Sequence, residues 1–92
     1  MSTAASKRYM ARVAKVPCVL CTALAIDGVP ANVHHVREGQ GMGQRASDWL
    51  TVALCRTCHQ SPIGLHGDRS LMKLAKLEEL DLLALTIAAL NP

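Results

Sequence analysis

Hydrophobic residues recur at helical spacing near the start of the chain. Between residues 6 and 16 they stand three or four positions apart, and basic side chains occupy the other faces, which predicts an amphipathic helix. Pro17 cannot lie inside that helix and disfavours helical geometry in the residue before it, so the helix is expected to end there. Residues 22–33 follow a tight turn and predict a loop or a short hairpin.

Two short segments farther along predict strands. Residues 33–36 form one candidate strand, and residues 49–54 form a second strand or extended segment. Residues 37–47 lie between them, contain three glycines and hold only one large apolar residue. This composition predicts a mobile surface loop.

The last third of the chain is again helical in pattern. Asp68 or Ser70 can cap a short helix, and Glu78 and Glu79 fit the first turn of a last helix, because negative charge is favourable at a helix N-terminus. The apolar run inside that last helix, residues 82–90, would span roughly 14 Å, about half of a bilayer core. It therefore predicts a buried helix and no membrane partner.

The composition makes the core of such a fold marginal. The chain has 92 residues, half of them hydrophobic, with no Phe, one Tyr (Tyr9) and one Trp (Trp49). A chain of this size buries only about 60–65% of its unfolded surface, and aromatic side chains contribute most to small cores. The four cysteines and four histidines are therefore the candidates for an additional stabilising site.

Charge is unevenly distributed along the chain. All ten Lys and Arg lie in residues 1–76 together with four acidic residues, which gives this part a formal charge of +6, whereas residues 77–92 carry −3. A basic surface favours a polyanionic partner, and a surface that only keeps the protein in solution explains the same charges. The charge alone leaves both interpretations open.

The cysteines form two Cys-x-x-Cys pairs, Cys18 with Cys21 and Cys55 with Cys58, separated by 33 residues. Each pair sets two thiolates about one tetrahedral edge apart, as a structural zinc ion with four sulfur ligands requires. Such a closed site contributes folding free energy directly. Four ordinary buried cysteines are the alternative; the run from Cys55 to His59 also fits a c-type haem attachment, but haem leaves the first pair unexplained.

His34 and His35 are neighbours on the first predicted strand, and His59 and His66 follow the second cysteine pair. Because adjacent side chains on a strand point to opposite faces, His34 and His35 cannot both bind one ion in simple strand geometry. One is expected to face a metal and the other the substrate, as a base near neutral pH. A cation such as Mg²⁺ would complete a site that cleaves phosphodiester bonds. Alternatively, His59 and His66 are spare zinc ligands in a Cys₃His site.

These motifs resemble a known family. Cys-x-x-Cys, a His-His pair and Leu-Cys-x-x-Cys-His together resemble the HNH (His-Me finger) endonucleases, which have a zinc-stapled ββα-metal core. Residues 34–47, followed by residues 48–55 and then 65–67, are similar to the phage Ref-type (recombination enhancement, RecA-dependent) nucleases. The resemblance covers about residues 8–90. It implies a small α+β fold, in which an N-terminal helix and C-terminal helices flank the ββα-metal core.

The resemblance implies a role for each matching histidine. His35 matches the general base that activates water. His34 matches a ligand of the catalytic divalent metal, Mg²⁺ or Mn²⁺. His59 opens the finger helix and matches a further metal ligand, and His66 is an additional one.

One position departs from the family pattern. The Asn usually found in the middle of the motif corresponds to Leu50. Asp48, two residues earlier, is expected to substitute for it, either as a metal ligand or as the residue that orients His35. Arg37 and Arg45 belong to the glycine-rich loop and are expected to bind DNA phosphates.

The predicted protein is therefore a metal-dependent DNA endonuclease with structural Zn²⁺, whose partners are DNA and a RecA-type recombinase filament. Residues 1–7 are expected to be a flexible N-terminus, and residues 8–92 a single nuclease domain. The first residues lack the apolar region of a secretory signal, so a cytoplasmic location is expected (the host cytoplasm for a phage protein). Two alternatives stay open: a non-catalytic zinc-binding module for DNA or protein, and an interaction protein acting through its apolar C-terminal helix.

Overall fold

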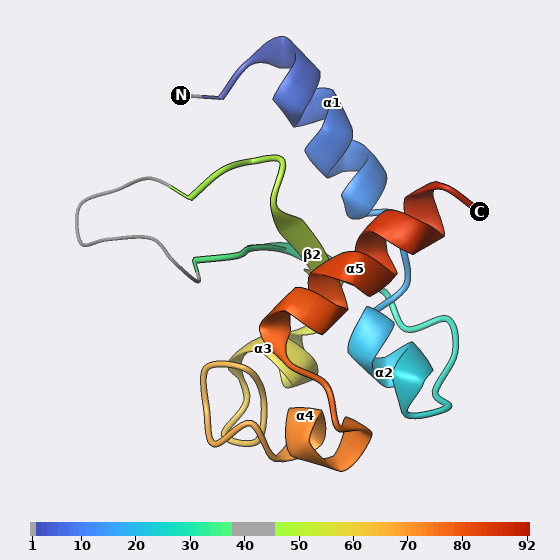
Figure 1. Ribbon diagram of the computed structural model, residues 1–92, viewed down its shortest axis with the longest axis vertical. Coiled ribbons are helices and arrows are strands. Elements are labelled where there is room, and N and C mark those ends of the chain that lie inside the picture. The colour runs from blue at the N-terminus through green and yellow to red at the C-terminus, as the bar shows by residue number, and fades with distance from the viewer. Residues whose placement is uncertain (1, 38–45) are drawn as a thin grey trace.

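The computed structural model describes residues 2–37 and 46–92, in which helices surround a small sheet (Figure 1). Most of the predicted glycine-rich loop, including Arg45, lies outside the described residues. The elements in chain order are α1 (Ala4–Val13), α2 (Val19–Ala23), β1 (Asn32–His35), β2 (Thr51–Leu54), α3 (Arg56–Gln60), α4 (Ser70–Ala75) and α5 (Glu79–Leu90). This is a small α+β fold, as predicted.

Helix α1 begins two residues earlier than its hydrophobic pattern predicted. The cause is a capping box between Thr3 and Ser6, in which each side-chain oxygen accepts a hydrogen bond of 3.0 Å from the backbone amide of the other residue. Residues 4–7, which the sequence placed in a flexible N-terminus, are therefore helical. The helix ends at Val13, and a tight turn carries the chain to Pro17.

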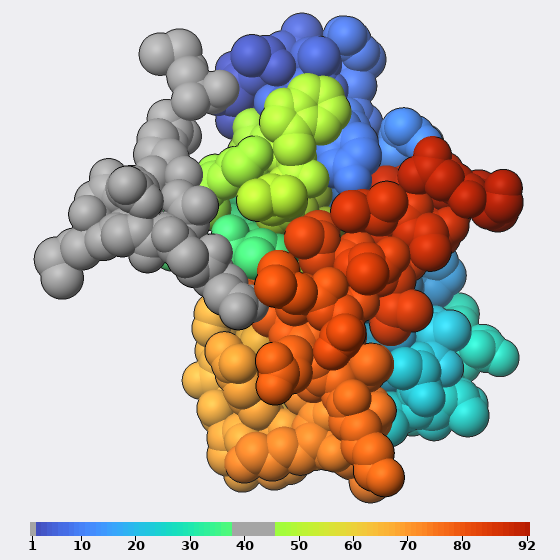
Figure 2. All heavy atoms as spheres, in the orientation of Figure 1, coloured from blue at the N-terminus to red at the C-terminus, as the bar shows by residue number. Residues whose placement is uncertain are grey.

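Strands β1 and β2 pair antiparallel, and the two histidines of β1 lie opposite the first two residues of β2. Every residue of β2 is buried, because α1 and α5 pack against it. Figure 2 shows α5 lying across this face of the molecule. The hydroxyl of Thr86 in α5 accepts a hydrogen bond of 3.3 Å from the amide of Ala53. The sheet thus has one strand inside the core and one strand that reaches the surface.

Helices α2 and α3 each begin directly after the first cysteine of a pair. The sulfur of Cys18 accepts a hydrogen bond from the amide of Cys21 at 3.4 Å, and Cys55 does the same for Cys58 at 3.5 Å. Each cysteine pair therefore caps the start of its own helix, and this brings the two sulfurs of a pair close together.

The two C-terminal helices begin near the acidic and hydroxyl residues that predicted them. Helix α4 starts at Ser70, whose amide donates a hydrogen bond of 2.9 Å to the carboxylate of Asp68. Helix α5 starts at Glu79, and the side chain of Glu78 accepts a hydrogen bond from a first-turn amide in a capping box. None of the helices in the described part of the chain is long and apolar enough to cross a membrane.

The core is built from small aliphatic side chains and from the cysteines, because the chain has so few aromatics. All four cysteines are among the buried hydrophobic residues. Tyr9 and Trp49 instead lie at the periphery, with ring centroids 5.1 Å apart, and Trp49 is half exposed. The four cysteines therefore form part of the core in a chain that has few aromatic rings to fill it.

Candidate functional site

Four sulfur atoms meet between α2 and α3. Cys21 Sγ lies 3.6 Å from Cys55 Sγ and 3.5 Å from Cys58 Sγ, and the sulfur of Cys18 completes a group within 4.8 Å. Sulfurs bound to one zinc ion at about 2.3 Å lie roughly 3.8 Å apart at the corners of a tetrahedron. All four residues are buried. The cysteines could therefore hold a zinc ion in a closed site, as the spacing predicted.

Burial affects the ionisation of cysteines in this cluster. Burial raises the pKa of Cys21 to about 12, and burial also raises the pKa of Cys58. Burial acts in the same direction at Cys55, but hydrogen bonds from the amide and thiol of Cys58 and from other thiols outweigh it and lower the pKa of Cys55. Zinc binds thiolates, so a bound ion at this site must offset the cost of ionising these buried thiols, and the two charges of Zn²⁺ supply that stabilisation.

Three histidines form a second cluster beside the first. His34 Nδ1 of β1 lies 3.0 Å from His59 Nε2 of α3, which lies 3.0 Å from His66 Nε2. The amide of His66 donates a hydrogen bond of 3.0 Å to the carbonyl of His59, which holds the loop against the helix. The four cysteines group together without these histidines, so the alternative of a Cys₃His site has no support.

The histidine cluster is open on one side. His34 is buried, His59 is partly buried and His66 is exposed. Burial lowers the pKa of His34, although its contact with Glu79 acts in the opposite direction. Burial is also the main cause that lowers the pKa of His59, and the charges of His34 and His66 lower it further. Both imidazoles are therefore neutral near pH 7, and a neutral imidazole is the form that binds a metal. The three nitrogen atoms could hold a metal ion with room for a further ligand.

Glu79 joins this cluster although the sequence pattern marked it only as a charge at the start of a helix. Its Oε2 lies 2.6 Å from His34 Nε2, and both residues are buried. We infer that His34 carries its proton on Nε2, because a carboxylate only accepts hydrogen bonds, and that its Nδ1 lone pair faces the cluster. No local spacing could have found this contact, because 45 residues separate the partners.

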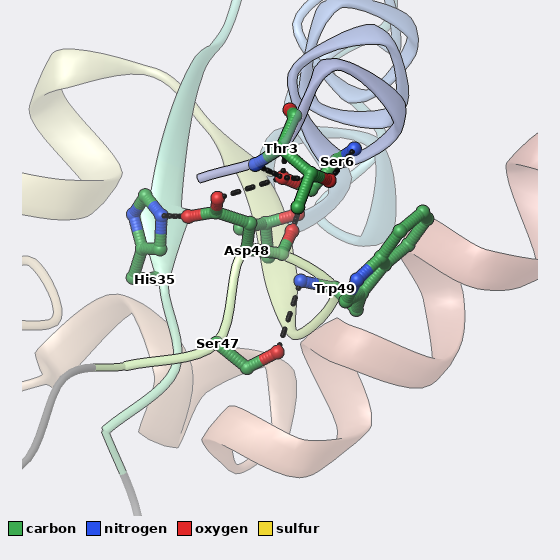
Figure 3. A network of polar contacts seen from close by, with 7 residues as sticks. Thr3, Ser6, His35, Ser47, Asp48 and Trp49 are labelled. Carbon is green, nitrogen blue, oxygen red and sulfur yellow. Dashed lines mark hydrogen bonds and ion pairs between the residues drawn. The ribbon is translucent and has the colours of Figure 1, made fainter. Parts of the chain in front are cut away.

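His35 points away from this cluster, as strand alternation predicted, and contacts Asp48 (Figure 3). His35 Nε2 lies 2.9 Å from Asp48 Oδ1, and the hydroxyl of Ser6 donates a hydrogen bond of 2.9 Å to Asp48 Oδ2. Hydrogen bonds from Ser2, His35 and Ser6 lower the pKa of Asp48 to about 2. Asp48 is therefore ionised at neutral pH and holds a histidine side chain that is 38% exposed.

The remaining predicted residues are placed as follows. Arg37 lines a cleft beside His34 and His66. Leu50, at the position where the family pattern has Asn, is exposed. Asp48 lies against His35 and is absent from the cluster of three histidines.

The fold and the two clusters define a small α+β protein with a four-cysteine site that can hold zinc and a neighbouring group of histidines. A family model described as recombination enhancement, RecA-dependent nuclease matches residues 2–77. The chain belongs to this family, which confirms the predicted resemblance to Ref-type nucleases; the family is one of nucleases, and its description links them to recombination and to RecA. No curated protein and no solved structure matches the chain.

Proposed function

We propose that this chain is a DNA endonuclease of the HNH (His-Me finger) type, which hydrolyses phosphodiester bonds with a divalent metal during phage recombination. The observation that carries the proposal is the division between two adjacent histidines. His34 faces His59 in the cluster, whereas His35 faces Asp48 nearer the surface. The order β1, β2, α3 is the order of a ββα-metal core, and membership of a nuclease family supports the activity.

His34, His59 and His66 would hold the catalytic metal ion. When bound, the ion would polarise the phosphate and stabilise the negative charge on the leaving oxygen. Imidazole nitrogens suit zinc, iron, nickel and copper ions, whereas Mg²⁺ and Mn²⁺ both suit oxygen ligands. The three histidines therefore do not choose between the two predicted ions, and both are used in the test.

His35 is the general base of the proposed reaction. Its Nε2–H donates to the ionised Asp48, so the lone pair of Nδ1 is available to a water molecule. The water gives a proton to His35 Nδ1 while its oxygen bonds to phosphorus and one P–O ester bond breaks; solvent protonates the leaving oxygen. Asp48 is a positioning residue in this scheme, and Ser6 holds its second oxygen.

Substitution of His35 by Ala tests this scheme. We expect cleavage to fall by about 10²–10⁴-fold, because a general base acts only in the transition state. Zinc content, thermal stability and DNA affinity should match those of the wild type. Ser47→Ala, next to Asp48, is the control, since the hydroxyl of Ser47 accepts a hydrogen bond from the amide of Trp49 and lies outside the contact between His35 and Asp48. Both variants are assayed with Mg²⁺ and Mn²⁺, with and without a RecA-type filament on the DNA.

Two results would show that the proposal is wrong. One is a wild-type protein, freed of contaminating nuclease, that cuts no DNA under any of these conditions. The other is a His35→Ala protein that cuts as fast as the wild type. The first result would replace the enzyme with a non-catalytic zinc-binding module for DNA or protein, and the second would exclude His35 as the general base.

A further inference from the structure

An open cleft of about 850 Å³ adjoins the histidine cluster. Its lining includes His34 and His66, and also residues in or beside α4 and at the start of α5, which we call the α4 side of the cleft. The volume is within the range of about 300–1,000 Å³ that is usual for ligand sites. Whatever occupies this cleft therefore lies beside the candidate metal ligands.

The α4 side of the cleft carries three cations, Arg69, Lys73 and Lys76. Lys73 lies within α4, whereas Arg69 and Lys76 flank the two ends of this short helix, and all three line the cleft. Within residues 2–37 and 46–92, the structure shows no ion pair between any of the three and a carboxylate. Arg69 Nε donates a hydrogen bond of 3.0 Å to the carbonyl of Leu65, which holds the base of the guanidinium group in place.

The two acidic residues of the cleft are already engaged in hydrogen bonds. Glu79 contacts His34, and the side chain of Glu78 accepts a hydrogen bond from a backbone amide in the first turn of α5. Arg37 adds a fourth cation to the lining. The cleft therefore presents positive charge to an incoming ligand, next to nitrogen atoms that could hold a metal.

We propose that the α4 side of this cleft binds the phosphodiester backbone of the nucleic acid next to the phosphate that is cut. Lys73 and Lys76 each contact one phosphate, and Arg69 provides further N–H donors. The partly buried Leu77 is the apolar side chain that would face the sugar or base, and the buried Leu65 and Met72 support the cleft from below. The inference rests on the proposed function, because the histidine cluster defines where the cut phosphate lies.

Charge reversal at two positions tests the site. The variant Lys73→Glu with Lys76→Glu is compared with Lys7→Glu with Lys15→Glu, which makes the same charge change at exposed positions of α1 and the turn after it. Binding of a fluorescein-labelled 20-mer, as a duplex and as a single strand, is measured with zinc-loaded protein and no other divalent ion. The absence of cleavage in this assay separates the binding site from the proposed chemistry.

We expect the α4 pair to weaken binding at least 10-fold at low salt and to flatten the plot of log K against log salt by roughly two units, since each phosphate contact contributes about 0.9. The control pair should stay within about twofold of wild type, because screened surface charges far from the ligand act weakly. Circular dichroism and zinc content check the fold, and Lys73→Gln with Lys76→Gln gives a milder second variant.

Wild-type DNA affinity in both α4 variants would show that the proposed binding site is wrong. An equal loss of affinity in the control pair would also do so, because the loss would then reflect net charge alone. In the cleavage assay, the α4 pair should raise KM and keep kcat, whereas His35→Ala lowers kcat. A His35→Ala protein of full activity together with weakened binding in the α4 pair would reject the proposed chemistry and keep the binding site.

Discussion

The cysteine cluster and the histidine cluster are adjacent along the chain in α3, where Cys58 precedes His59, but they differ in solvent exposure. Every cysteine is buried, whereas the histidines run from buried His34 to exposed His66. A closed set of four ligands satisfies a metal completely and stabilises the fold, and an open set leaves a position for substrate. One short helix thus contributes both to the closed cluster that could hold zinc and to the open cluster of the proposed active site.

The two clusters also differ in how they are assembled. Each cysteine pair is closed by a contact across three residues, since the sulfur of Cys18 or Cys55 caps its own helix. The histidine cluster joins β1 to α3 across 25 residues, and it reaches α5 through Glu79. Local geometry thus builds each cysteine pair, whereas tertiary packing joins the two pairs across 34 residues and builds the whole histidine cluster.

The largest effect is expected where the closed cluster is broken. Cys55→Ser, or removal of the metal by a strong chelator, should abolish the folded state, because structural zinc contributes about 10–16 kcal/mol and a domain is stable by only about 5–15 kcal/mol. Circular dichroism and zinc analysis measure the loss. Thr57→Ala, an exposed change within α3, should leave both unchanged. A cooperatively folded, zinc-free Cys55→Ser protein would contradict the zinc site.

A smaller effect is expected where the open cluster is broken. His66→Ala should keep zinc and thermal stability, because His66 is exposed. Cleavage should fall about 100-fold at limiting Mn²⁺ and recover in part as Mn²⁺ is raised, since two ligands remain. Measurement of rate against Mn²⁺ concentration tests this expectation. Loss of zinc from the His66→Ala protein would mean that the two clusters are one site.

The smallest effect is expected from Glu79→Gln, which keeps the shape of the side chain but removes its charge. Loss of a carboxylate partner behind a ligating histidine weakens metal binding by about 10–100-fold. Titration of the zinc-loaded protein with Mn²⁺, followed by calorimetry, measures the change. Glu78→Gln is the matched control, because Glu78 caps α5 and does not contact His34. Equal Mn²⁺ affinity in the two variants would contradict the role of Glu79.

Much of the site could be predicted because its signals are local. The Cys-x-x-Cys spacing predicted a four-cysteine group, and the alternation of side chains on a strand predicted that His34 and His35 separate. The start of α1 was predicted less well, because the Thr3–Ser6 capping box lies before the hydrophobic pattern begins. The position of Asp48 was predicted, but the sequence left open whether it binds metal or orients His35.

By itself, the sequence determined the first helix, the last two helices, the two strands, the cysteine pairs and the opposite directions of two adjacent histidines, because spacing along a chain controls each of these features. It missed α2, where the pattern predicted a tight turn followed by a loop. Only the tertiary structure decided that Asp48 meets His35, that Glu79 holds His34, and that the cations of α4 face the same cleft. These contacts join segments 13 or more residues apart or depend on how α4 and α5 pack. Packing of the whole core sets such distances, and no local pattern records them.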